Sequence, residues 1–236
     1  MLRHFGASMG AVRRRIVACT RCPELRAYCH RVAVERKREF AHERYWGKPV
    51  PSIGSVDARV LIVGLAPAAH GGNRTGRMFT GDGSAVFLAR ALYRAGLATQ
   101  PTSVRRGDGF ELIDAFMTAA LRCAPPGNKP ASNQMAKCAD HMRAELDLLR
   151  SIRVVVALGK IGFDTIWARL RERGFTAAQR PIFGHDQVYQ LKNGDGRTIQ
   201  LLASYHPSRQ NTNTGKLTQP MLDRIFKRAW NLARSR

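Results

Sequence analysis

The sequence predicts an α/β protein of three layers, in which helices cover both faces of a central, four-stranded, mostly parallel sheet. Two observations carry this prediction. Mainly apolar runs without regular alternation are typical of parallel strands covered on both faces, and such strands are expected at residues 60–63, within 111–122, at 153–158 and at 199–203. Segments with apolar residues at helical spacing separate these strands.

The other elements follow from local signals. Residues 1–18 are basic and are expected to be a frayed start, residues 30–46 are expected to form a solvated helix, and the prolines of residues 48–54 require an extended segment. The remaining expectations are helices that begin near Gly83, at about 132–150, from Gly159 through Trp167 and at about 217–234, and a short strand at 187–191. We expect one domain over residues 1–236, with a cysteine-bearing N-terminal extension of about residues 1–56.

Polar loops follow three of the predicted strands. Residues 66–82 contain four glycines and several polar side chains, residues 204–215 form a second polar loop, and the loop around Asn128 forms a third. Open α/β proteins bind ligands at the carboxyl ends of their strands, where these loops can converge. The sequence therefore places a ligand site at this edge of the sheet.

The charge of the chain indicates a polyanionic partner. Its 39 basic and 17 acidic residues give a formal net charge of +22, which favours nucleic acid over a merely solubilising charge excess or a membrane surface. No stretch approaches the ~20 apolar residues that span a bilayer. Residues 1–18 lack the pattern of a signal peptide, so we expect a cytoplasmic protein.

Cysteines supply a candidate metal site. Cys19, Cys22, Cys123 and Cys138 form a Cys-x2-Cys pair followed by two single residues, and Cys29 is left over. Four thiolates can hold either an iron–sulfur cluster or a structural zinc, and the spacing does not choose between them. Buried apolar cysteines are the alternative, which suits one cysteine better than four.

Four segments together carry a family resemblance. Gly64–Asp82 resembles the first motif of family 5 (type B) uracil-DNA glycosylases and His206–Gly215 their second motif; Tyr45–Pro51 and Arg122–Pro130 also match. The resemblance implies a glycosylase that hydrolyses the bond between deoxyribose and uracil in duplex DNA and initiates base excision repair. No obligate protein partner is inferred. It also implies a [4Fe–4S] cluster on the four cysteines named above.

Three residues then become candidates for the reaction. Phe79 could stack on an extruded base, His206 could donate a hydrogen bond to the departing base, and Asp82 could orient water and stabilise the cationic sugar. Phe79 could instead be a core aromatic, His206 an exposed or helix-capping residue, and Asp82 a helix N-cap. The capping and catalytic roles of Asp82 are compatible.

Further residues take roles by the same resemblance. Asn128 could bind the base or the water, although it could also be a turn residue. The base site is expected to include Gly64 and Ala66 beside Phe79. The residues expected to contact DNA are Asn73, Arg74, Ser208, Arg209, Gln210 and Asn211. For the residues after His206, the alternative is an ordinary polar loop.

The pocket lacks groups that other branches of the superfamily use. Ala66, Pro67 and Ala68 stand where those branches carry a carboxylate or an asparagine, so catalysis rests on Asp82 or on stabilising the leaving base. Ala119 stands where the related family 4 enzymes have an asparagine that resembles a base reader. We therefore expect weak discrimination, with hypoxanthine and modified pyrimidines excised as well as uracil.

Two other classes of protein remain open. A non-catalytic, metal-containing nucleic-acid-binding module would explain the charge and the cysteines, but it leaves Asp82 and His206 without a purpose. A nucleotide-binding enzyme is the second, but the glycine-rich loop has neither the P-loop nor the dinucleotide-binding spacing.

Overall fold

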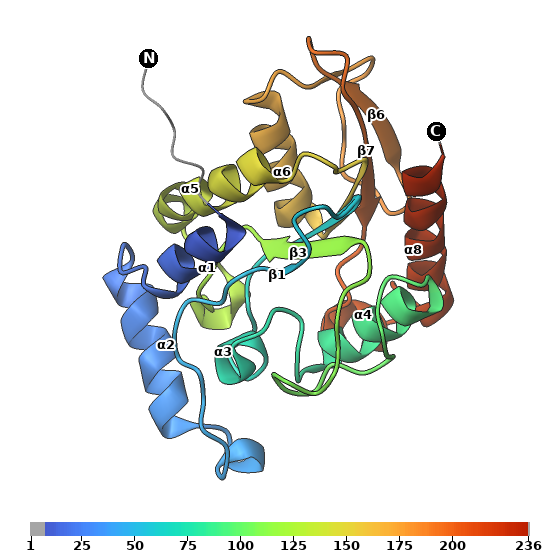
Figure 1. The fold of residues 1–236 in the computed structure, drawn as a ribbon. Coiled ribbons are helices and arrows are strands. Elements are labelled where there is room, and N and C mark those ends of the chain that lie inside the picture. The colour runs from blue at the N-terminus through green and yellow to red at the C-terminus, as the bar shows by residue number, and fades with distance from the viewer. Residues whose placement is uncertain (1–7, 236) are drawn as a thin grey trace.

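A computed structural model describes residues 8–235 of the chain (Figure 1). Within these residues, seven strands form one mixed sheet in the order β1-β3-β2-β4-β7-β6-β5. The strands are β1 (Ile53–Gly54), β2 (Val60–Gly64), β3 (Ala115–Ala119), β4 (Val154–Leu158), β5 (Thr176–Ala177), β6 (Val188–Lys192) and β7 (Thr198–Ser204).

The centre of the sheet confirms the expected parallel strands. β3, β2, β4 and β7 are parallel neighbours, and all residues of β2, β3 and β4 are buried. The expectation of a four-stranded sheet is wrong in number, because β1, β6 and β5 extend it with antiparallel pairs. β1 and β5 have two residues each, too few for a hydrophobic pattern to reveal them.

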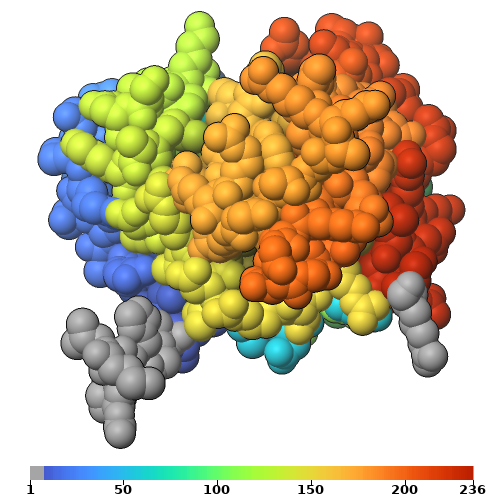
Figure 2. All heavy atoms as spheres, turned by 90° about the horizontal axis from the view of Figure 1, so that it is seen from above, coloured from blue at the N-terminus to red at the C-terminus, as the bar shows by residue number. Residues whose placement is uncertain are grey.

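Helices cover both faces of this sheet, so the three-layer α/β/α architecture is confirmed. α4 and α8 pack on one face, whereas α1, α5 and α6 pack on the other. The helices are α1 (Met9–Val17), α2 (Pro23–Glu35), η1 (Arg38–Phe40), α3 (Gly72–Thr75), α4 (Gly83–Arg94), η2 (Pro126–Asn128), α5 (Ser132–Leu148), α6 (Lys160–Arg171), α7 (Arg209–Asn213) and α8 (Gln219–Arg234). In Figure 2 the side chains of α5, α6 and the β6–β7 segment form the near surface, with the N-terminal segment and α8 at opposite sides.

The N-terminal segment is more ordered than the sequence suggested. Residues 9–17, expected to be frayed, form α1, which buries Met9, Val12 and Ile16 against the sheet. The part of that expectation that concerns residues 1–7 lies outside the described residues. The helix expected at 30–46 is also displaced, because Pro23 occupies the first turn of α2 and the helix ends at Glu35.

The sheet directs four connections toward one edge. The segments that follow β2, β3, β4 and β7 begin at Leu65, Ala120, Gly159 and Tyr205, at the carboxyl ends of the parallel strands. This edge carries both sequence motifs. Among residues 8–235, no helix has the length and apolar character needed to cross a membrane.

Candidate active site

Asp82 caps α4 and lies in a tightly fitted position. Its Oδ1 accepts a hydrogen bond from the Ala85 backbone N–H at 2.9 Å, so the expected N-cap is confirmed. A Cβ atom on Gly71 would lie 2.1 Å from Asp82 Oδ2. Burial raises the pKa of Asp82, opposed by the backbone N–H groups of Ala85 and Ser84 and by the charge of Arg209. The carboxylate is therefore fixed in position. The backbone N–H groups and the arginine offset only part of the cost of burying its charge.

Phe79 lies over the end of β2. A Cβ atom on Gly64 would be 2.8 Å from the phenyl ring, so this position leaves no room for a side chain. The Phe79 backbone has a φ of 45°, a left-handed conformation that a bulky residue adopts only when its surroundings impose it. Phe79 is half-buried against the core, with one side toward His206.

His206 brings the second motif to the first. The centroids of its ring and the Phe79 ring are 5.7 Å apart, with 32° between the ring planes. Burial lowers the pKa of His206 to about 4, so its imidazole is neutral at neutral pH. A Cβ atom on Gly159, the residue after β4, would lie 3.2 Å from His206 Cβ. Three separate loops thus meet around one imidazole.

The polar side chains of α3 are used inside the protein. Arg74 is 4% exposed, ion-paired with Glu43, and donates to the carbonyls of His70 at 2.8 Å and Gly81 at 2.7 Å. Asn73 is 1% exposed and donates to the Cys29 carbonyl at 3.2 Å. The expectation that Asn73 and Arg74 contact DNA is therefore wrong for their side chains, because both are buried inside the protein.

The second motif places its residues in two different ways. Ser208 is the N-cap of α7 and accepts from the Asn211 backbone N–H at 3.4 Å, while the Asn211 amide donates to the His206 carbonyl at 2.8 Å. Arg209 and Gln210 are exposed. A Cβ atom on Gly83 would lie 3.5 Å from Arg209 Nε, so this arginine extends over the start of α4.

Two other predicted residues lie apart from this group. Asn128 is exposed at the end of η2 with a φ of 57°, as a turn residue would be. Within the described residues, no hydrogen bond joins its side chain to Asp82 or His206. Ala66 packs against the cysteine-bearing cluster. The roles of both in binding the base stay predictions.

The four predicted cysteine ligands line a single pocket. Cys19, Cys22, Cys123 and Cys138 surround it, whereas the Cys29 thiol lies outside and contacts the Ala124 carbonyl at 3.6 Å. All five thiols are free. Among residues 8–235, no three His, Cys, Asp or Glu side chains are close enough to hold a metal ion. The ligands of a cluster that contains several irons lie farther apart than the ligands of a single metal ion.

Orphaned polar groups lie beside the four cysteines. Arg122 is 1% exposed and pairs through one nitrogen with Glu145, but its Nε and second terminal nitrogen have no hydrogen-bond partner within the described residues. Both ring nitrogens of His141, 2% exposed, also lack one there. Arg122 and His141 line the cysteine pocket. Donors without acceptors are costly when buried, so the pocket fits a group that accepts hydrogen bonds.

Known proteins match both the motifs and the whole chain. A family model described as the uracil DNA glycosylase superfamily matches residues 51–232. The chain belongs to the uracil-DNA glycosylase superfamily. It is 45% identical to a type-5 uracil-DNA glycosylase of Mycobacterium leprae over 99% of both chains. It is 46% identical to one of Thermus thermophilus, over 92% of this chain and 95% of that protein.

A more distant branch of the superfamily also matches. A type-4 uracil-DNA glycosylase of Archaeoglobus fulgidus is 28% identical over 67% of this chain and 70% of its own length. Because the superfamily consists of glycosylases, the chain is an enzyme that hydrolyses N-glycosidic bonds. This membership favours the enzyme over the non-catalytic module that the sequence left open.

Sequence reasoning missed residues that act through the others. Gly71 and Gly159 leave room for Asp82 and His206, and His185 accepts the Tyr205 backbone N–H at 3.2 Å and stacks on the Tyr205 ring at 4.9 Å. Gly71 lies within the first motif, so its place in that motif could have indicated that it has a role in the site. His185 lies in a stretch without periodicity, and nothing in the sequence indicates that it supports the residue before His206.

Proposed function

We propose that this enzyme excises uracil from duplex DNA by hydrolysing the bond between the base and deoxyribose, and so initiates base excision repair. The observation that carries the proposal is the grouping of Phe79, His206 and Asp82 at the carboxyl edge of the sheet. Gly64 gives the Phe79 ring its place at the floor of this edge. An aromatic platform of this kind suits a nucleotide that has left the base stack.

Asp82 would act on the sugar side of the bond. The transition state gathers positive charge on the deoxyribose, and a fixed carboxylate stabilises such a charge more effectively than water does. Its cap to Ala85 uses only one carboxylate oxygen, Oδ1. The other oxygen could orient the attacking water. Burial raises the pKa of this carboxyl group, and the backbone N–H groups of Ala85 and Ser84 and the charge of Arg209 oppose that rise.

His206 would act on the leaving base. Uracil departs as an anion, with charge that develops on a carbonyl oxygen and on the ring nitrogen that was bonded to the sugar. A neutral imidazole still carries one N–H, and it can donate this hydrogen bond to the developing charge at neutral pH. The low pKa of His206, which results from burial, supports this role. The Asn211 amide, bonded to the His206 carbonyl, would position the residue.

Cys19, Cys22, Cys123 and Cys138 would hold a [4Fe–4S] cluster, with a structural role. Support comes from the shared pocket, from the unpartnered nitrogens of Arg122 and from the one N–H of the neutral His141 ring, which could donate to sulfur. When bound, such a cluster would link the N-terminal segment to α5 and to the loop after β3. Purified protein should carry iron and absorb broadly near ~400 nm, and cysteine-to-alanine variants should lose both.

The substrate range should extend beyond uracil. Ala119 pairs with Gly64 in the β2–β3 ladder, and its methyl group cannot hydrogen-bond a pyrimidine. Strong rejection of a wrong base requires buried polar groups that the wrong base leaves unpaired. We therefore include hypoxanthine and modified pyrimidines among the substrates. The site of action would be the DNA of a prokaryotic cytoplasm.

A single-turnover assay tests this function. Duplexes with one deoxyuridine or one deoxyinosine are incubated with excess enzyme, then cleaved with alkali at the abasic sites. The control is a mock preparation purified in the same way from cells that carry the empty vector, which exposes any host glycosylase that contaminates the enzyme. Excision of uracil by the wild type alone supports the proposal, and its absence contradicts it. Absence of deoxyinosine cleavage alone would contradict only the broad range.

A further inference from the structure

The connection between α4 and β3 folds back beside the first motif. Ala98 and Leu112 form an isolated antiparallel bridge, and the chain between them makes an excursion away from the sheet. At its far end the Ser103 carbonyl accepts a hydrogen bond from the Gly81 backbone N–H at 2.8 Å. Residues 103–108, which we call the 103–108 arm, are thus bound directly to the residue that precedes Asp82.

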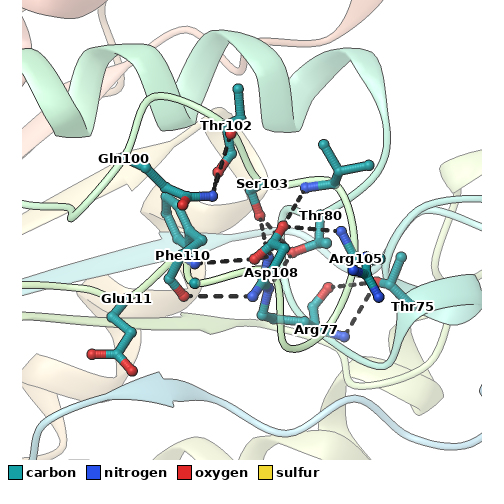
Figure 3. Close-up of polar contacts among 12 residues, drawn as sticks. Thr75, Arg77, Thr80, Gln100, Thr102, Ser103, Arg105, Asp108, Phe110 and Glu111 are labelled. Atoms are coloured by element: carbon teal, nitrogen blue, oxygen red, sulfur yellow. Dashed lines mark hydrogen bonds and ion pairs between the residues drawn. The ribbon is translucent and has the colours of Figure 1, made fainter.

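One carboxylate orders the 103–108 arm, as Figure 3 shows. Asp108 accepts hydrogen bonds from the backbone N–H groups of Val104 at 2.7 Å, Arg105 at 3.1 Å and Phe110 at 3.0 Å. It also pairs with Arg77 at 2.8 and 2.9 Å. Burial alone would raise the pKa of Asp108, but these donors together lower it to about 2. The arm is therefore organised around a permanent negative charge.

The same arginine fixes the first motif to the arm. Arg77 is 7% exposed, and it donates to Thr80 Oγ1 at 2.8 Å and Ser103 Oγ at 3.0 Å. The Thr80 and Ser103 hydroxyls are 2.8 Å apart. Thr80 and Gly81, which bind the arm, lie between Phe79 and Asp82 in the sequence. The arm is therefore attached directly to the segment that carries both residues.

The tip of the arm presents an apolar side chain and two cations. Val104 is 59% exposed, unusual for a residue whose backbone is so firmly held. Arg105 and Arg106 are exposed next to it, and Arg106 lies 5.2 Å from the centroid of the Trp46 ring. A rigid loop with cations at its tip suits a polyanion, because binding it costs little conformational entropy.

We propose that the 103–108 arm is a DNA-contacting element additional to the two motifs. Arg105 and Arg106 bind backbone phosphates of the duplex beside the extruded nucleotide, and Val104 packs against the adjoining deoxyribose. The inference rests on the proposed function, since it assumes that the partner is duplex DNA. Charge complementarity and the bond between Gly81 and Ser103 carry it.

The test separates binding from chemistry. The double variant Arg105→Ala/Arg106→Ala is compared with the wild type and with Arg150→Ala/Arg171→Ala, a charge-matched control whose exposed arginines lie just before β4 and at the end of α6, near the opposite edge of the sheet. Affinity for a duplex with an uncleavable abasic analogue is measured against salt concentration. Single-turnover excision of uracil at saturating enzyme is measured beside it.

We expect the slope of log affinity against log salt to fall in magnitude by about 1 for each arginine removed from the arm, and by much less in the control. Excision at saturating enzyme should stay within about threefold of the wild type. Equal slopes in all three proteins would overturn the inference, as would equal losses in both double variants. Failure of the wild type to excise uracil would instead refute the proposed function.

Discussion

The two motif loops of this enzyme use their polar residues in opposite ways. In the first loop, Arg74 and Arg77 are buried and their donors are used on the protein's own carbonyls, hydroxyls and carboxylates. In the second, Arg209 and Gln210 are exposed at the start of the short helix α7. The first loop therefore positions Phe79 and Asp82, whereas the second extends toward whatever approaches the site.

This difference separates two kinds of consequence. Substitutions in the first loop should alter the rate of the chemical step or the stability of the fold, because its side chains hold other groups in place. Substitutions at the exposed positions of the second loop should alter affinity for DNA. His206 is the exception, since it belongs to the second loop but lies against Phe79.

The largest effect is expected for Asp82→Asn. The amide keeps the size of the side chain and can still accept from the Ala85 N–H, but it removes the charge that we propose faces the sugar. Loss of one preorganised electrostatic contact typically costs about 10²–10³ in rate. Single-turnover excision of uracil should fall by that factor with an unchanged melting temperature. An active variant would reduce Asp82 to a helix cap.

Gly71→Ala should come next, with a loss of about 10² in rate. The new Cβ would lie 2.1 Å from Asp82 Oδ2, so the carboxylate has to move. Displacement of a catalytic group by about 1 Å can cost this much. Gly194→Ala is the matched control, because nothing lies within 4 Å of the corresponding Cβ. Equal rates in the two variants would show that the position of Asp82 is not critical.

The pH profile of the excision rate tests the roles that we propose for Asp82 and His206 at once. The pKa of Asp82 is raised by burial, and the ionised form is needed, so the rate should fall about tenfold per pH unit below that pKa and be constant above it. Because burial lowers the pKa of His206 to about 4, no inflection is expected near the usual histidine value of ~6.5. A rate that falls as the pH rises through that value would mean that His206 acts as a cation.

Arg74→Ala should destabilise the fold rather than weaken DNA binding. The change removes hydrogen bonds to His70 and Gly81 and leaves Glu43 without its partner, at a cost of about 2 kcal/mol. That corresponds to a melting temperature lower by roughly 4–8 °C in a chain of this size. The salt dependence of DNA affinity should stay at its wild-type value, and a reduced slope would contradict the assignment.

Arg209→Ala is the counterpart in the second loop and should have the smallest effect. Its side chain is exposed, so we expect the melting temperature to change by less than about 2 °C. The salt slope of DNA affinity should fall in magnitude by about 1, because one phosphate contact is lost. If the slope is unchanged while the excision rate drops, Arg209 acts on Asp82 rather than on DNA.

The sequence predicted the elements whose residues share one environment. β2 and β4 are unbroken apolar runs because helices cover both faces of the sheet. Their burial could therefore be predicted from their residues alone. α1 escaped prediction since three arginines follow Val12, although Met9, Val12 and Ile16 form one buried face. β1 and β5 owe their existence to neighbouring strands rather than to their own residues.

The site could be predicted only in part for a related reason. Asp82, Phe79 and His206 stand out because their chemistry matches a need of the reaction. Whether a polar residue such as Arg74 faces outward or inward depends on partners distant in the sequence, here Glu43. The 103–108 arm could not be predicted for the same reason, because only tertiary contacts attach it to Gly81 and Arg77.

The pairing of β2 with β3 continues beyond the ends of both strands. The Ala120 and Leu121 N–H groups donate to the carbonyls of Gly64 and Leu65 at 3.0 and 2.9 Å, and Arg122 and Cys123 follow directly. The floor beneath Phe79 and one wall of the cysteine pocket are thus a single ladder of backbone amides. Cys123 lies two residues beyond Leu121, so the cysteine pocket and the support of Phe79 are joined through the backbone alone.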